Sequence, residues 1–287
     1  MKLVRYGAPG SEKPGIIDSQ GKIRDLSEQV VDISSATLAA GALRDLASLN
    51  IDDLPLVPGE PRLGPCVGGV GKFLCIGLNY SDHAAETGAS VPPEPVLFTK
   101  ATSAIIGPND DVRLPRGSTK TDWEVELGIV IGSACKYVSE TDALDHVAGY
   151  CVVNDLSERE YQLERSGTWD KGKGCDTFGP LGPWLVTKDE VPDPCALHMW
   201  LDVNGHRFQD GSTATMVYRP AFLVSYLSQF MTLHPGDVIS TGTPPGVGMG
   251  QKPPVFLKVG DRIDLGIEGL GSQHQRVVED RGLPDNA

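Results

Sequence analysis

Apolar and polar positions alternate most clearly in residues 123–131, where a valine separates two glutamates and a run rich in β-branched side chains follows. This alternation predicts a strand, because successive side chains of a strand point to opposite faces. Glu124 and Glu126 would then share one face, roughly 6 to 7 Å apart. A second apolar run over residues 147–154 also predicts a strand, and it leads directly into another carboxylate, Asp155.

Similar patterns predict further elements along the chain. Short strands are expected over residues 3–6, 15–18, 73–77 and 96–99. Helices are expected over residues 37–48, 81–87, 158–165 and 221–227. Asn204-Gly205 follows another strand pattern and predicts a type I′ hairpin. Strands outnumber helices without a regular β-α alternation, so the predicted fold class is a mixed, strand-rich α+β fold.

A change in composition divides the chain near residue 65. Residues 54–61 contain three prolines and a glycine, which is typical of an extended linker. The residues before it combine short strands with one helix. We therefore expect a small N-terminal α+β domain over residues 1–65 and a catalytic domain over residues 66–287, with a disordered tail from residue 280.

Composition excludes several classes of protein. The net charge is −13 and the 25 lysines and arginines are scattered, which argues against nucleic acid as a partner. The sequence has no run of 18 apolar residues and no signal peptide, so no membrane contact is expected and the cytoplasm is the expected location. The six cysteines form no Cys-x-x-Cys pair and are expected to be free thiols.

Common nucleotide-binding and hydrolase motifs are incomplete or absent in the sequence. Residues 66–73 imitate a phosphate loop, but Cys66 replaces its first glycine and Phe73 replaces the Ser or Thr that would hold Mg²⁺. Residues 246–251 lack the third glycine of a dinucleotide-binding loop, since Gln251 stands there. Neither Gly-x-Ser-x-Gly nor His-Glu-x-x-His occurs.

The three acids at the two predicted strands suggest a metal site. Glu124 and Glu126 would repel each other on one face unless a cation joined them, and Asp155 would bring a third oxygen ligand from a neighbouring strand. Oxygen ligands of this kind suit Mg²⁺ or Mn²⁺. The alternative is an ordinary edge strand whose charged face is solvated.

A histidine and a glutamate lie three residues apart on the predicted helix 81–87. His83 and Glu86 would share a face of that helix, where the carboxylate can orient the imidazole as a general base for water. A surface ion pair is the alternative.

Two further segments offer groups that bind anions. The predicted loop 171–180 carries Lys173 between glycines, and residues 240–246 offer hydroxyls and backbone amides after a strand. Either segment could equally be an ordinary turn.

Several segments, taken in chain order, form a set. They are Gly77-Leu78-Asn79-Tyr80, His83 with Glu86, Glu124-Val125-Glu126-Leu127, Asn154-Asp155, Lys173, residues 176–180 and Thr241-Gly242-Thr243-Pro244. Over about residues 65–280 this set resembles the fumarylacetoacetate hydrolase superfamily. The resemblance implies a strand-rich sandwich or roll, preceded by the short variable domain that many bacterial members carry.

The resemblance also implies roles for individual residues. It implies that Glu124, Glu126 and Asp155 hold one Mg²⁺ or Mn²⁺ per subunit. It implies that His83 and Glu86 activate water and that Lys173 supports an oxyanion. The residues expected to contact substrate are Tyr80, Lys100, Gln162, Gly242 and Thr243. Leu78 departs from the pattern, because many relatives that cleave acylpyruvates have arginine there, which puts the substrate tail in doubt.

The implied reaction is the hydrolysis of a carbon–carbon bond in a 2,4-diketo acid to pyruvate and a carboxylic acid. Residues 77–110 look most like bacterial enzymes that cleave 2,4-diketo-3-deoxy sugar acids of the L-fuconate or L-rhamnonate type, with a hydroxy acid such as lactate as second product. Acylpyruvate hydrolysis, oxaloacetate decarboxylation and keto-enol isomerisation are alternatives, as is a non-catalytic metal- or ligand-binding protein. The expected partner is a small 2-oxo acid, and the expected assembly is a homodimer or homotetramer.

Overall fold

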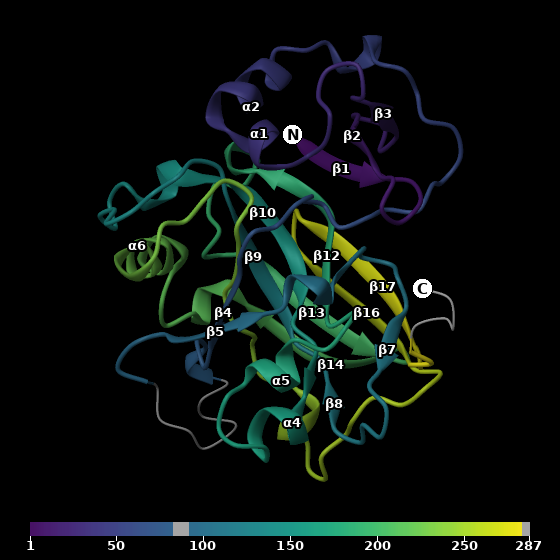
Figure 1. Cartoon of the computed structure of the whole chain (residues 1–287), viewed down its shortest axis with the longest axis vertical. Helices are drawn as coiled ribbons and strands as arrows, with labels where there is room; N and C mark the ends of the chain where they lie inside the picture. Colours follow the sequence, from purple (N-terminus) through teal and green to yellow (C-terminus); the bar gives the residue numbers. More distant parts are fainter. Residues whose placement is uncertain (83–91, 283–287) are drawn as a thin grey trace.

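The computed structural model describes residues 1–82 and 92–282, and most of its regular structure belongs to two sheets (Figure 1). The larger sheet runs in the order β3-β2-β1-β12-β10-β9-β15-β4-β5, and β6 also pairs with β12. Its strands are β1 (Lys2–Tyr6), β2 (Lys13–Ile17), β3 (Ile23–Asp25), β4 (Phe73–Gly77), β5 (Val96–Lys100), β6 (Ile105–Ile106), β9 (Val125–Ile131), β10 (Val147–Asn154), β12 (Gly179–Thr187) and β15 (Val238–Ser240).

The second sheet packs against one face of the first and runs in the order β14-β13-β16-β17-β7. Its strands are β7 (Val112–Leu114), β13 (His198–Val203), β14 (His206–Ser212), β16 (Arg262–Ile267) and β17 (Gly271–Glu279). The short strands β8 (Thr121–Asp122) and β11 (Ser157–Glu158) form a separate pair. Parallel and antiparallel pairs occur together, so the predicted mixed, strand-rich α+β class is confirmed.

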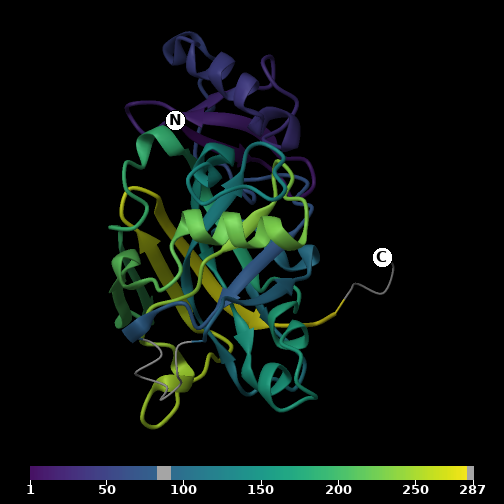
Figure 2. The same ribbon diagram turned by 90° about the vertical axis from the view of Figure 1, so that its left-hand side faces the viewer.

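The helices are few and short. They are α1 (Ser35–Leu38), α2 (Ala40–Ala47), α4 (Arg159–Leu163), α5 (Asp170–Lys173) and α6 (Pro220–Phe230). Figure 2 shows α6 crossing in front of the strands, where its buried side chains Leu223, Val224 and Leu227 join the core of the two sheets. No helix in residues 1–82 and 92–282 is long and apolar enough to cross a bilayer.

Most predicted elements agree with the structure. The strands expected over 73–77 and 147–154 have those bounds, and Asn204 and Gly205 turn the β13–β14 hairpin with positive φ values of 53° and 78°, as a type I′ turn requires. The predicted helix 37–48 is broken at Ala39, whose extended ψ of 141° separates α1 from α2. Residues 83–87 of the predicted helix 81–87, and 283–287 of the predicted tail, lie outside the described residues. All six cysteines are free, as expected.

The first 65 residues extend the larger sheet instead of standing apart from it. β1 pairs with β12 through Lys2 opposite Val186 and Leu3 opposite Leu185, and β2 and β3 follow at that edge. The N-terminal segment at the upper end of Figure 1 therefore continues the sheet that carries the three predicted metal ligands. The boundary near residue 65 stays a prediction.

Candidate metal centre and active site

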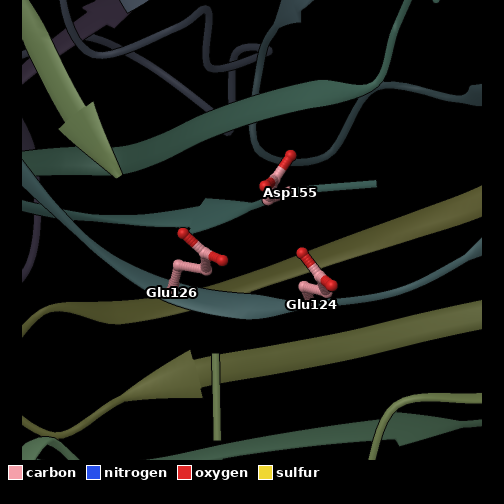
Figure 3. A group of neighbouring side chains, drawn as sticks. All are labelled: Glu124, Glu126 and Asp155. Carbon is pink, nitrogen blue, oxygen red and sulfur yellow. The ribbon is translucent and has the colours of Figure 1, made fainter. Parts of the chain in front are cut away.

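Adjacent strands bring the three predicted metal ligands together. Glu124 immediately precedes β9, Glu126 lies within it, and Asp155 immediately follows β10. Val153 pairs with Glu126 in the ladder, and Asp155 N donates to Glu124 O at 2.9 Å. Figure 3 shows Glu124 and Glu126 on the same side of β9, with Asp155 on the neighbouring strand. One oxygen from each carboxylate lies within 4.8 Å of the others.

The alternative of a solvated edge strand is wrong. β9 lies between β10 and β15, so both of its edges are hydrogen-bonded. The side chains are also buried, because Glu124 is 6 % exposed, Glu126 is 2 % exposed and Asp155 is fully buried. Buried carboxylates are costly unless a cation or hydrogen bonds compensate them.

Lys173 supplies part of that compensation. Its Nζ donates to Glu124 Oε2 at 2.6 Å and to Asp155 Oδ2 at 2.7 Å. The segment predicted as a loop begins as the one-turn helix α5, which directs Lys173 into the site, while Lys171 stays exposed and donates to Arg165 O. Burial by itself would lower the pKa of Lys173. The Asp155 and Glu124 carboxylates raise that pKa by more than burial lowers it, so the ammonium stays charged.

Arg159 is a second buried cation at the site, and the sequence analysis missed it. It is 4 % exposed and binds Glu124 Oε1 at 2.8 Å, and it also pairs with Asp122 at 2.9 Å. Its Nη1 donates to Gln162 Oε1 at 3.0 Å. The available signal was the spacing of Arg159 and Gln162, three apart in a predicted helix, which places both on one face.

The two glutamates of β9 have opposite electrostatic environments. Burial would raise the pKa of Glu124, but the Lys173 and Arg159 cations outweigh it and lower that pKa to about 2. Burial and the neighbouring Asp155 and Glu124 carboxylates raise the pKa of Glu126 well above its usual range. Among the described residues, the donors to Glu126 are neutral: Ser240 Oγ at 2.6 Å and Gly242 N at 2.9 Å.

This arrangement fits a divalent cation with oxygen ligands. Three carboxylate oxygens converge, and Glu126 has no lysine or arginine partner among the described residues. A hard divalent ion would supply the missing positive charge, and carboxylates are its usual ligands. The residues present therefore fit the metal that the sequence predicts.

The predicted substrate contacts fall into two groups. Gln162, Gly242 and Thr243 line a cavity of about 230 Å³, as the three carboxylates do. Tyr80 and Lys100 do not line it. The Tyr80 hydroxyl donates to Met199 Sδ at 3.3 Å within the core, and Lys100 Nζ donates to Asp155 Oδ1 and to Leu156 O at 2.9 Å. Lys100 therefore contacts the site through Asp155, whereas Tyr80 is part of the core. A substrate contact for either stays a prediction.

The Gly242 backbone amide and the Thr243 hydroxyl both donate hydrogen bonds to other groups of the protein. Gly242 N–H bonds to Glu126, and the Thr243 hydroxyl donates to Val125 O at 2.9 Å while accepting from Gln209 Nε2 at 2.8 Å. Gly242 has a φ of +93°, and a Cβ there would lie 2.9 Å from Asn79 Cβ. Glycine is therefore required for the loop to approach β4.

His83 and Glu86, the predicted water-activating pair, lie outside the described residues. Their roles stay predictions from the sequence.

Comparisons with known proteins indicate one family. Residues 72–278 match the family model described as fumarylacetoacetate (FAA) hydrolase C-terminal. A Burkholderia multivorans protein named only as a hydrolase is 66 % identical over 276 residues, covering 96 % of this chain and 98 % of that protein.

Two solved structures illustrate the activities found among relatives. A maleylpyruvate hydrolase from a Sphingobium species, solved with manganese(II) and pyruvate, has a TM-score of 0.82 and 30 % identity. A 2-hydroxyhepta-2,4-diene-1,7-dioate isomerase from Mycobacterium marinum has a TM-score of 0.77 and 33 % identity. Each alignment covers 98 % of this chain and all of the other. The chain belongs to the fumarylacetoacetate hydrolase family, whose members include hydrolases and isomerases.

Proposed function

We propose that this protein is a metal-dependent hydrolase that cleaves a carbon–carbon bond of a 2,4-dioxo acid and releases pyruvate. The observation that carries the proposal is the convergence of three buried carboxylates in the lining of a cavity that Lys173 and Gln162 also line. The similar maleylpyruvate hydrolase was solved with manganese(II) and pyruvate, the kind of ion and product that such a site would hold.

Glu124, Glu126 and Asp155 would hold one Mg²⁺ or Mn²⁺ per subunit. The ion would act as a Lewis acid toward the keto oxygen of a bound 2-oxo acid. Gln162 is 3 % exposed, and its Oε1 is fixed by Arg159, so its amide nitrogen is left to face the cavity. Gln162 and Lys173 would stabilise a developing oxyanion.

The remaining step requires an activated water. His83 with Glu86 would take a proton from water, which adds to the carbonyl carbon at position 4. The bond between carbons 3 and 4 then breaks, its electron pair enters the enolate of pyruvate, and carbon 3 finally takes a proton. The second product is a carboxylic acid.

The alternatives differ in whether they need that water. Oxaloacetate decarboxylation and keto-enol isomerisation pass through a similar enolate without hydrolysis, and the similarity to an isomerase keeps isomerisation as the second candidate. For the hydrolase, the sequence favours a deoxy-diketo sugar acid, with other acylpyruvates as the alternative. We further propose a homodimer or homotetramer.

The test is pyruvate release from a panel of 2,4-dioxo acids. We expect release with Mg²⁺ or Mn²⁺ and none with EDTA. His83→Ala should lower the rate by about 10²- to 10⁴-fold, because it removes the base, while the exposed His234→Ala serves as the matched control. Undiminished pyruvate release by the His83 variant would show that His83 is not the base. Oxaloacetate decarboxylation or keto-enol isomerisation that survives the same substitution would favour those activities. Metal binding without any turnover would favour a non-catalytic protein.

A further inference from the structure

The residues that line the cavity fall into two chemical sets. The polar set consists of the three carboxylates with Lys173, Arg159 and Gln162. The other set, which we call the apolar wall, consists of Leu78, Phe98, Leu163, Trp169 and Met249. The two sets adjoin where Lys173 Nζ lies 5.0 Å from the centroid of the Phe98 ring. A ligand whose 2-oxo acid head reaches the metal ligands would therefore place its tail against hydrocarbon and aromatic groups.

The packing around Trp169 makes the apolar wall a built surface. The Phe98 and Trp169 ring centroids are 5.2 Å apart. The indole also lies directly on Gly77, where a Cβ would come within 2.3 Å of Trp169 Cζ3. No residue with a side chain fits at position 77 without moving the ring. The indole at the start of α5 therefore packs directly on the backbone at the end of β4.

Leu78 holds an unusual backbone conformation at the same wall. Its φ is +56°, a left-handed value that is unfavourable for a residue with a Cβ. The neighbouring Asn79 side chain fixes the segment through bonds to Thr241 O at 2.7 Å and Tyr218 O at 3.0 Å. The backbone of Leu78 is thus strained at a position that lines the cavity.

The described charges of the cavity lining belong to the polar set. Among the described lining residues, the only cations are Lys173 and Arg159, and each is bonded to buried carboxylates. A second carboxylate on a ligand tail would lose its water at the apolar wall, and the described lining residues offer it no cation that is not already paired. A tail hydroxyl would likewise lose hydrogen bonds there, which is unfavourable when no partner replaces them.

We propose that the cavity selects 2,4-dioxo acids with a short alkyl or aryl tail over those whose tail carries a carboxylate or hydroxyl groups. This selects the simple acylpyruvates over the deoxy-diketo sugar acids that the sequence favours. The proposal rests on the proposed function for the position of the 2-oxo acid head. The volume of about 230 Å³ lies below the roughly 300–1,000 Å³ of sites for drug-sized ligands, so the tail is short. The apolar wall makes Leu78 a specificity-determining residue.

The first experiment measures binding without turnover. Calorimetry on the full chain loaded with Mn²⁺ compares 2-oxoheptanoate with 2-oxoheptanedioate, and 2-oxohexanoate with 5-hydroxy-2-oxohexanoate. None of these has the second keto group needed for cleavage. We expect the apolar member of each pair to bind about tenfold more tightly or better. Equal or tighter binding of the polar members would overturn the proposal.

The second experiment compares turnover of matched substrates. Pyruvate release from 2,4-dioxohexanoate and its 5-hydroxy derivative, and from 2,4-dioxoheptanoate and 2,4-dioxoheptanedioate, should show the same preference in kcat/KM. If no member yields pyruvate, the proposed function fails while the binding series still decides the tail preference. If the polar members are cleaved faster, the function stands and the tail preference fails.

A variant adds the charge that the apolar wall lacks. Leu78→Arg should shift the binding ratio toward 2-oxoheptanedioate by about tenfold or more. Leu56→Arg, at a 56 % exposed position outside the cavity lining, is the matched control and should leave the ratio unchanged. Met249→Lys tests the same wall from another segment if the first variant does not fold. A ratio unmoved in both wall variants would contradict the proposal.

Discussion

At the scale of single residues, Glu126 has the least compensated charge of the candidate metal centre. Lys173 bonds to both other carboxylates of the cluster. In the described part of the chain, Glu126 instead accepts hydrogen bonds from the Ser240 hydroxyl and the Gly242 backbone amide. Burial and the two neighbouring carboxylates raise its pKa. A raised folded-state pKa means that the metal-free protein loses stability as the pH rises above the unfolded-state pKa.

We expect Glu126→Gln to stabilise the metal-free protein at pH 7, because it removes that penalty while keeping the shape of the side chain. Stability should then fall less between pH 5 and pH 8 than in the wild type. The variant should also lose most of its stabilisation by Mg²⁺ or Mn²⁺. Thermal unfolding with and without metal measures both effects, with the exposed Glu140→Gln as control. Undiminished metal affinity would show that Glu126 is not a ligand.

At the scale of elements, Asn79 connects three segments that surround the cavity. It is 1 % exposed, and its amide joins the end of β4 to the loop after β15 and to the residues before α6. It donates to Thr241 O and Tyr218 O and accepts from Tyr218 N at 2.8 Å. These bonds position both Leu78 and Gly242.

We expect Asn79→Ala to lower the free energy of unfolding by about 3 kcal/mol, because it leaves several buried backbone groups without partners. Metal affinity should fall as well, since the Gly242 amide would no longer be fixed beside Glu126. Urea unfolding and calorimetry measure the two effects. Asn50→Ala removes an exposed bond to Asp53 and should stay within about 0.5 kcal/mol of the wild type. A similarly small effect at Asn79 would contradict this account.

At the scale of the whole molecule, the first 65 residues complete the large sheet and cover one of its faces. Leu3, Ile16, Leu26, Ile33 and Leu38 are almost fully buried in a core shared with strands β9, β10 and β12. Burying five such side chains contributes about 10 kcal/mol. That is comparable to the total stability of about 5–15 kcal/mol of an ordinary domain.

We expect a chain truncated to residues 66–287 to aggregate, because it would expose that apolar face and the hydrogen-bonding edge of β12. Solubility and size-exclusion chromatography measure the effect, and co-expression of residues 1–65 should restore the soluble protein. A soluble fragment that unfolds at the temperature of the full chain would show that residues 66–287 fold independently of residues 1–65.

Local periodicity determined much of this protein from the sequence alone. The two-residue repeat of a strand put Glu124 and Glu126 on one face, and Asn204-Gly205 fixed the hairpin. The ordered motifs also indicated the family and the three acids of the metal centre. These features depend on residues close together in the chain, so a sequence pattern contains them.

Only the tertiary structure decided which distant side chains meet. The pairing of β9 with β10 places Asp155 beside Glu124, and the position of α4 brings Arg159 to the same carboxylate. Lys100 and Tyr80 do not line the cavity, because their side chains bond to Leu156 O and to Met199 Sδ. The direction of each side chain depends on strand register and on packing between segments far apart in sequence, and neither is contained in a local pattern.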